Sequence, residues 1–216
     1  MTKTEVIQQI RDTGVIPVVR ATTADDAMRA IDAIREGGIS LLEITMTVPG
    51  AVALIEQLAT RLGKDAVVGA GTVLDVETAR ACIQSGAQFI VSPSLNPATI
   101  EYCRRSDVAV MPGALTPTEV VTAWNAGADF VKVFPAGAVG GASYLRALKA
   151  PLPQIELVPT GGVSLTTAGD FIRAGASALA VGTDLVDIKA IREGQASIIT
   201  ERAKQFVEIV REARAS

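Results

Sequence analysis

The sequence of 216 residues contains no histidine. This absence excludes Ser-His and Cys-His nucleophile systems as well as histidine metal sites. Any acid–base chemistry must therefore use carboxylates, lysines, hydroxyl groups or water. The chain has only two cysteines, Cys82 and Cys103, and their spacing fits neither a CxxC motif nor a disulfide framework. We expect both to be free thiols on helices in a reducing cytoplasm.

The sequence also lacks an excess of charge of one sign and lacks long apolar runs. Its 20 basic and 23 acidic residues give a net charge of −3, with no basic block, so nucleic acid is not an expected partner. No apolar run approaches the length of a bilayer span. Residues 1–14 lack the apolar core of a secretory signal. We therefore expect no membrane partner and a cytoplasmic location.

What the chain does contain is a regular alternation of two kinds of segment. Runs rich in β-branched residues, each ending in Gly, Pro, Ser or Thr, alternate with stretches of helical periodicity such as 23–38 and 75–87. The runs are 14–20, 40–46, 66–73, 89–94, 108–115, 130–136, 155–163 and 178–186. Strict alternation predicts an α/β fold with a parallel sheet.

Eight such units without a linker predict a closed (β/α)₈ TIM barrel, formed by residues 1–216 as a single domain. An extra N-terminal helix at about 3–12 and a C-terminal helix at about 192–214 are expected to bracket the barrel. An open doubly wound sheet is the alternative. That fold normally carries a glycine-rich fingerprint after its first strand, and residues 18–26 contain no glycine.

A lysine lies in the middle of the sixth run, "FVKVFPA". Side chains alternate along a strand, so Phe130, Lys132 and Phe134 share one face. Helices cover the outer face of a parallel barrel, where a buried ammonium group would lack a partner. We therefore expect Lys132 to point into the barrel. The same alternation in the second run, "SLLEITM", predicts that Glu43 points inward as well.

Two interpretations of Lys132 and Glu43 follow. In the first, the two residues form a structural pair that fills the barrel, since neither is easily buried unless paired or solvated. Alternatively, they are a reactive lysine and a carboxylate at the C-terminal ends of the strands, where active sites in this fold lie. A lysine amine in apolar surroundings is favoured in its neutral form, which is a nucleophile for Schiff-base chemistry. We favour the second interpretation.

The seventh and eighth runs end in the glycine-rich segments "PTGGVS" and "AVGTDLV". Loops after these two strands of a barrel often form a phosphate site from backbone N–H groups. The candidate residues are Thr160, Gly161, Gly162, Gly182 and Thr183. The alternative is that the glycines only form tight turns.

Four further residues are expected at the mouth of the barrel. Arg20 ends the first run and can hold a carboxylate in a bidentate manner, although a surface salt bridge fits its position equally well. Thr72 ends the third run and can donate its hydroxyl group to the same anion. Pro93 and Phe134 are expected to form apolar walls.

Six motifs occur together in order: "LLEIT", "GAGTV", "FIVSPSLN", "MPGALTPTE", "FVKVFPA" and "VPTGGV". With this spacing the chain resembles the 2-keto-3-deoxy-6-phosphogluconate (KDPG) aldolases, including the 4-hydroxy-2-oxoglutarate (KHG) enzymes, from about residue 5 to 190. The resemblance implies a homotrimeric class I aldolase without metal or cofactor. Its small keto-acid phosphate substrate would be cleaved to pyruvate and glyceraldehyde 3-phosphate. The resemblance also implies that Lys132 forms the Schiff base and that Glu43 is the general acid–base.

The same resemblance assigns further residues and shows one departure. It implies that Thr72 and Pro93 belong to the pyruvate pocket, that Phe134 packs beside the imine, and that the phosphate contacts are Gly161, Gly162 and Thr183. Many members of the family bind the substrate carboxylate with an arginine four residues after the glutamate, a position that is Thr47 here. We expect Arg20 to supply the missing charge.

Two alternatives to KDPG cleavage remain from the sequence. In the first, the substrate is the galactonate epimer, 2-keto-3-deoxy-6-phosphogalactonate, or unphosphorylated 4-hydroxy-2-oxoglutarate. In the second, the chain is a catalytically silent, phosphate-binding barrel that serves as an assembly module, because this fold hosts many functions. The joint presence of Lys132, Glu43 and the glycine-rich turns favours an aldolase.

Overall fold

Short parallel strands form the centre of the molecule in the computed structural model, which describes residues 1–215. Ser216, the last residue of the predicted domain, lies outside the described residues. The strands are β1 (Val15–Val19), β2 (Leu41–Thr45), β3 (Val67–Gly71), β4 (Phe89–Val91), β5 (Ala109–Met111), β6 (Gly113–Ala114), β7 (Val131–Val133), β8 (Leu157–Pro159) and β9 (Leu179–Val181). Every residue of these strands is buried, as expected where both faces of a sheet are covered.

The strands close into a ring with two irregular joints. One sheet has the order β5-β4-β3-β2-β1-β9, and the other has the order β6-β7-β8. The run 108–115, predicted as one strand, is divided into β5 and β6 at Pro112, because proline has no N–H for the ladder. At the other joint, bridges from Leu157 to Ala176 and from Thr160 to Ala180 join the β8 and β9 segments. The predicted (β/α)₈ barrel is confirmed.

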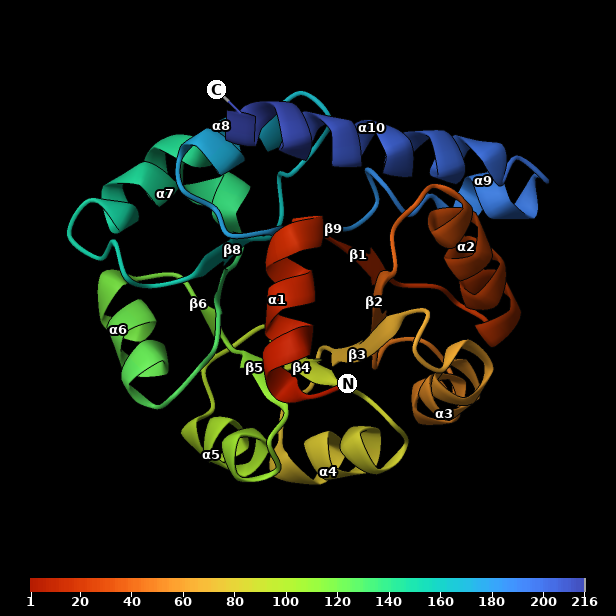
Figure 1. Ribbon diagram of the computed structural model, residues 1–216, viewed down its shortest axis with the longest axis horizontal. Coiled ribbons are helices and arrows are strands. Elements are labelled where there is room, and N and C mark those ends of the chain that lie inside the picture. The colour runs from red at the N-terminus through yellow and green to blue at the C-terminus, as the bar shows by residue number, and fades with distance from the viewer. Residues whose placement is uncertain (216) are drawn as a thin grey trace.

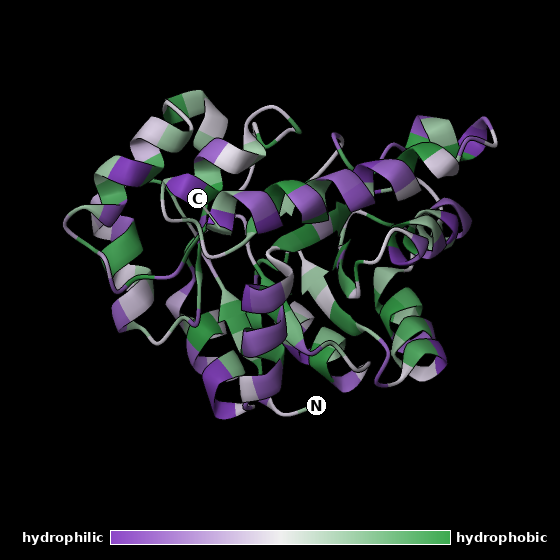
Figure 2. Ribbon diagram, turned by 45° about the horizontal axis from the view of Figure 1, so that its top comes forward, coloured by the Kyte–Doolittle hydropathy of each residue, from purple (hydrophilic) through white to green (hydrophobic). Residues whose placement is uncertain are grey.

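Helices surround this ring, as Figure 1 shows. They are α2 (Ala24–Glu36), α3 (Ala51–Leu62), α4 (Val76–Gln84), α5 (Pro97–Arg105), α6 (Pro117–Asn125), α7 (Ala142–Lys149) and α8 (Ala168–Arg173). Figure 2 shows hydrophobic strands inside and hydrophilic residues on the outer sides of the helices, the pattern of an amphipathic helix that buries one face. None of the helices within residues 1–215 is long and apolar enough to cross a membrane.

Both cysteines lie on these outer helices, Cys82 on α4 and Cys103 on α5, and both are free and buried. Burial raises the pKa of the Cys82 thiol to about 11 and that of the Cys103 thiol to about 12. Each thiol therefore stays protonated and unreactive at neutral pH. The expectation of free thiols on helices is confirmed.

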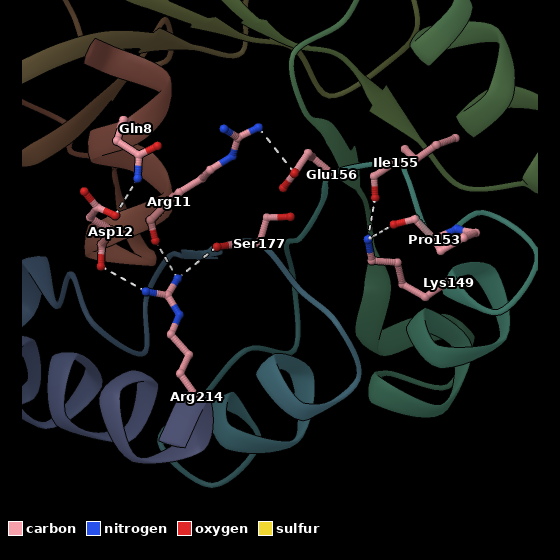
Figure 3. Close-up of polar contacts among 9 residues, drawn as sticks. All are labelled: Gln8, Arg11, Asp12, Lys149, Pro153, Ile155, Glu156, Ser177 and Arg214. Carbon is pink, nitrogen blue, oxygen red and sulfur yellow. Dashed lines mark hydrogen bonds and ion pairs between the residues drawn. The ribbon is translucent and has the colours of Figure 1, made fainter. Parts of the chain in front are cut away.

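Helix α1 (Lys3–Thr13) crosses the N-terminal end of the barrel (Figure 1). Lys3 pairs with Asp129 at 3.0 Å, and Arg11 pairs with Glu156 at 3.3 Å (Figure 3). These two acidic residues lie just before β7 and β8, so the contacts are at the ends where the strands begin. The predicted N-terminal helix thus covers this end and leaves the opposite end open for a site.

The C-terminal region contains two helices where one was predicted at 192–214. Helix α9 (Ile188–Arg192) and helix α10 (Ser197–Ala215) are separated by a turn in which Gly194 has φ 74°. Glycine adopts this left-handed conformation without steric cost, which explains the break. Near its end, α10 is attached to the barrel by Arg214, which donates hydrogen bonds to the carbonyl groups of Arg11, Asp12 and Ser177 (Figure 3).

Candidate functional site

A cavity of about 560 Å³ opens at the C-terminal ends of the strands. It is lined by every site residue predicted from the sequence except Thr47. Active sites of this fold lie at the same end of the barrel. Residues that are as far apart in the sequence as Arg20 and Thr183 are therefore brought together in one cavity.

Lys132 lies in the middle of β7, and only 6% of its surface is exposed. Its Nζ atom is 5.3 Å from the centroid of the Phe134 ring, which is within range of a cation–π contact. On the same side of the strand, the Phe130 ring lies beneath the guanidinium group of Arg11 at the closed end. The lysine side chain thus lies inside the barrel and extends toward the open end, between an apolar base and an aromatic wall.

Glu43 lies in the middle of β2 and is completely buried. Both of its carboxylate oxygens lack a hydrogen-bond partner among the described residues. Burial raises the pKa of this carboxyl group, and the positive charges of Lys132 and Arg20 oppose the shift. A buried polar group without a partner is rare in a folded protein. Glu43 lines the cavity, but neither of its carboxylate oxygens is exposed to solvent.

Lys132 and Glu43 therefore line one cavity without forming a pair. Within residues 1–215, neither a hydrogen bond nor an ion pair shorter than 4.0 Å joins the two side chains. The structure thus gives no support to the interpretation of a structural Lys–Glu pair that fills the barrel. The amine and the carboxylate therefore have no hydrogen bond to each other that a ligand would need to break.

Thr72 follows β3 at the rim of the cavity and has φ 59°. For a β-branched residue this left-handed conformation is a strained outlier. Such strain persists only where the surrounding structure enforces it, and it is frequent at ligand sites. The conformation supports a binding role for the end of β3.

The two glycine-rich turns differ in what their glycines do. Gly161 and Gly162 have φ 82° and 78°, and a Cβ atom on Gly162 would lie 2.8 Å from the Cα atom of Gly137. Gly137 belongs to the short 3₁₀ helix Ala136–Val139 that follows β7 and packs onto this turn. The first turn therefore needs glycine for its backbone, as the tight-turn interpretation holds. A Cβ atom on Gly182 would have no neighbour within 4 Å, so packing does not require a glycine at this position.

Free amide groups accompany these turns. Among the described residues, no hydrogen-bond acceptor is found for the backbone N–H groups of Gly162, Gly182 and Thr183, whereas the bridge from Thr160 directs the Gly161 N–H group at the β9 segment. The four residues all line the cavity. Converging free amides form an anion-binding concavity, so this end of the cavity is suited to a phosphate or carboxylate group.

Arg20 is exposed just after β1, and it lines the cavity. No ion pair of Arg20 is found within residues 1–215, so the alternative of a surface salt bridge has no support. Its guanidinium group is near enough to Glu43 to lower the pKa of that carboxyl group against the effect of burial. Arg20 is thus a free cation at the end of the cavity that holds the buried carboxylate.

Thr47 is the one predicted substrate-binding residue that the structure places elsewhere. Its side chain does not line the cavity. Instead its Oγ1 atom is 2.6 Å from Oγ1 of Thr45, and the Thr45 hydroxyl group donates to the carbonyl group of Val19 at 3.1 Å. A direct contact of Thr47 with the substrate stays a prediction, and the geometry does not favour it, because the hydroxyl group lies against Thr45.

The sequence reasoning missed two parts of the site. Gly71 ends β3, and a Cβ atom there would overlap the Glu43 carboxylate; a glycine inside a strand is the signal for such a close approach. The segment from Asp184 to Lys189 also lines the cavity. It was missed because residues 184–186 were assigned to the eighth run and residues 187–191 to no element. Asp187 begins α9 by accepting a hydrogen bond from the Ala190 amide.

Comparisons with known proteins agree with this geometry. Residues 6–202 match the family described as "KDPG and KHG aldolase". The chain is 35% identical to a 2-dehydro-3-deoxy-6-phosphogalactonate aldolase of Escherichia coli (strain K12), over 92% of this chain and 95% of that protein. It is 34% identical to a 2-dehydro-3-deoxy-phosphogluconate aldolase of Treponema pallidum (strain Nichols), over 95% of this chain and 96% of that protein.

A solved structure is similar over the same extent. It is a KDPG aldolase of Legionella pneumophila with pyruvate captured as a covalent carbinolamine intermediate. The TM-score is 0.85 at 28% sequence identity, and the match covers 92% of this chain and 96% of that one. The similarity therefore extends over the barrel as a whole.

Proposed function

Because this chain belongs to the KDPG and KHG aldolase family and is therefore an aldolase, a lyase, we propose that it cleaves KDPG to pyruvate and glyceraldehyde 3-phosphate, and that it also accepts 4-hydroxy-2-oxoglutarate. One observation carries the proposal. A buried lysine and a buried carboxylate without hydrogen-bond partners meet in one cavity at the open end of the barrel. Amine nucleophiles of this kind form Schiff bases with ketones.

The first half of the proposed reaction belongs to Lys132. Its neutral amine attacks the C2 carbonyl carbon of the substrate and forms a carbinolamine, which loses water to give a protonated imine. The imine accepts the electron pair that becomes available when the C3–C4 bond breaks. The attack needs the neutral form of the amine, because only that form has a free electron pair.

The second half belongs to Glu43. Its carboxylate receives the proton of the C4 hydroxyl group through water, so that the C3–C4 bond breaks and the aldehyde product leaves. The enamine that remains is protonated at C3, the future methyl carbon of pyruvate, and hydrolysis frees the product and Lys132. Its raised pKa makes this carboxylate a stronger proton acceptor than an ordinary one.

Arg20 is the proposed partner of the substrate carboxylate. It is a free cation at the cavity, and it replaces the arginine that related enzymes carry at the position of Thr47. Removal of one charge-assisted bond to a carboxylate costs about 1.5–3 kcal/mol. We therefore expect Arg20→Ala to raise the KM for the keto acid at least tenfold. An unchanged KM would show that the carboxylate is held elsewhere.

The proposed phosphate site is formed by the turn at Gly161 and by the free amides of Gly162, Gly182 and Thr183. The buried Thr160 hydroxyl group, which also lacks a partner among the described residues, belongs to the same site. Gly182→Ala tests this site because the added methyl group meets nothing in the chain. We expect an inhibition constant for inorganic phosphate about tenfold higher, with stability within about 0.5 kcal/mol of the wild type. Unchanged inhibition would place the phosphate at another part of the cavity.

Pyruvate and sodium borohydride test the Schiff base directly. Reduction traps the imine as a stable secondary amine, and we expect the adduct on the Lys132 peptide. Lys149 is a control within the same digest. Burial lowers its pKa, but its Nζ atom donates to the carbonyl groups of Pro153 and Ile155 outside the cavity (Figure 3). An adduct on Lys149, or none at all, would contradict the assignment of Lys132.

The choice of substrate needs a separate measurement. The galactonate epimer differs from KDPG only in its configuration at C4, and the relatives include aldolases named for each sugar acid. We expect kcat/KM to be highest for KDPG when both epimers and 4-hydroxy-2-oxoglutarate are compared. A higher value for the galactonate epimer would reassign the substrate and leave the chemistry of Lys132 unchanged.

A homotrimer in the cytoplasm completes the proposal. The trimer is supported by membership of the family, and multi-angle light scattering tests it by the mass of three chains. The cytoplasmic location is supported by the two free thiols, since disulfides are rare in reducing compartments. Fractionation of cells tests the location, and a secreted pool would contradict it.

A further inference from the structure

The segment that follows β9 brings a third cation to the cavity. Besides Arg20 and Lys132, the basic residue that lines the cavity is Lys189, on the same segment as Gly182 and Thr183. The two glycine-rich turns offer amides and hydroxyl groups but contain no basic residue. We propose that Lys189 binds the distal phosphate group of the substrate and so sets the preference for phosphorylated keto acids. This inference rests on the proposed function.

The backbone that carries Lys189 is firmly anchored. Ile191 is fully buried, and its carbonyl group accepts a hydrogen bond of 2.7 Å from Arg29 on α2. Arg192 forms an ion pair of 2.8 Å with Asp26 on the same helix. Two contacts at the end of α9 thus hold it against α2, and they fix the backbone that carries Lys189 even though the lysine side chain is exposed.

The amine of Lys189 is only weakly engaged. Its side chain is 83% exposed, and its ion-pair partner is Glu193, one turn further along α9, at 3.7 Å. Exposed pairs of this kind contribute little, because solvent and salt screen them. A phosphate monoester carries a charge between about −1.5 and −2 at neutral pH. A bound phosphate would therefore attract the Lys189 ammonium group more strongly than the Glu193 carboxylate does.

The neighbouring acidic residues explain why a cation is needed at this end. Asp184 and Asp187 also line the cavity. Asp187 is balanced by Arg202 on α10 at 3.3 Å, whereas no ion pair of Asp184 is found within residues 1–215. An unbalanced carboxylate beside the free amides repels an anion. Lys189 offsets that charge, so the segment becomes compatible with phosphate.

Lys189→Gln tests the proposal by a ratio. We compare kcat/KM for KDPG with kcat/KM for the same keto acid without its phosphate, and we expect the ratio to fall about fivefold, as for the loss of one exposed ion pair. Inorganic phosphate should inhibit the variant about fivefold more weakly by the same reasoning. Lys189→Arg keeps the charge and should retain most of the preference. Lys204→Gln is the matched control, because Lys204 pairs with Glu201 on the outer helix α10, outside the cavity.

The outcomes separate this proposal from the one on which it rests. Failure of pyruvate and borohydride to label Lys132 in the wild type would refute the proposed function. Normal labelling together with an unchanged ratio in Lys189→Gln would overturn only the role of Lys189. An equal fall of the ratio in Lys204→Gln would also overturn it, since net charge and not position would then be responsible.

Discussion

Gly71 leaves the space that the carboxylate of Glu43 occupies. The two residues lie on neighbouring strands, β3 and β2, and a Cβ atom at Gly71 would overlap Oε1 of Glu43. The glycine has no unusual φ that would require it, so its small size and not its flexibility explains its presence. Gly71 is therefore part of the site although it carries no reactive group.

Gly71→Ala is expected to lower kcat about 100-fold, since the displaced carboxylate can no longer transfer its proton efficiently. The double variant with Glu43→Gln provides the control. If the alanine acts through Glu43, adding it to Glu43→Gln lowers kcat no further. Additive losses in the double variant would mean that Gly71 affects catalysis in some other way.

Glu43 is also expected to make the protein less stable as pH rises. Its folded pKa is raised by burial from the ordinary value of 4.5, so between that value and the raised pKa the unfolded state loses the proton first. The free energy of unfolding then falls with increasing pH. Glu43→Gln removes this effect, and we expect the variant to be more stable by about 0.5–2 kcal/mol at pH 8, with the gain vanishing below pH 4.5.

Glu208→Gln is a control for this measurement, because Glu208 should change the free energy of unfolding with pH in the opposite direction. A hydrogen bond from Arg211 lowers the pKa of Glu208, so its stabilising contribution is present above its ordinary pKa and is lost as pH falls. Removing it should therefore destabilise the protein at neutral pH and have no effect in acid. Denaturant unfolding across pH distinguishes the two, and a pH-independent gain for Glu43→Gln would contradict the prediction.

The sequence predicted the barrel and the two central residues because both follow from strong periodic signals. Every strand is buried on both faces and alternates with an amphipathic helix, so the order of elements was readable. Lys132 and Glu43 stood out because a charge inside an apolar strand must face the barrel interior. The inward position of Lys132 beside Phe134 then follows from the alternation of side chains.

The parts that could not be predicted depend on close approaches between distant segments. Gly71 matters only because β2 brings Glu43 against it. Thr47 has a hydroxyl group at a suitable place in the sequence, but the chain turns it toward Thr45. Lys189 was overlooked because it lies between the eighth run and the predicted C-terminal helix, on a short helix that only the structure places beside the cavity. Each case requires knowledge of packing that a periodic pattern does not contain.

Thr47 has a testable indirect role as a positioning residue for Arg20. Through Thr45 it is connected to the carbonyl group of Val19, directly before the arginine. Thr47→Val removes the hydroxyl group and should raise the KM for the keto acid about threefold with a smaller change in kcat, as for the loss of one modest hydrogen bond. Thr47→Ser should restore the wild-type KM.

Thr122→Val is the matched control for this variant. The Thr122 hydroxyl group donates to the carbonyl group of Thr118 at 2.7 Å on the exposed side of α6, away from the cavity. Its loss removes a similar hydrogen bond and should leave KM as in the wild type. Equal changes in the two valine variants would remove the case for a special role of Thr47.

Arg214 is expected to hold the C-terminal helix on the barrel. Its guanidinium group donates to three backbone carbonyl groups, two of them at the C-terminal end of α1 (Figure 3), where a cation is favourable. It also fills the space beside Gly14, whose Cβ atom would lie 2.6 Å from Nη2. We expect Arg214→Ala to lower the free energy of unfolding by about 1–2 kcal/mol.

Arg211→Ala is the control, because it removes only an exposed pair with Glu208 on the same helix. It should have a much smaller effect in the same denaturant titration. If the two alanine variants unfolded at the same denaturant concentration, the three carbonyl contacts would not be what fastens α10.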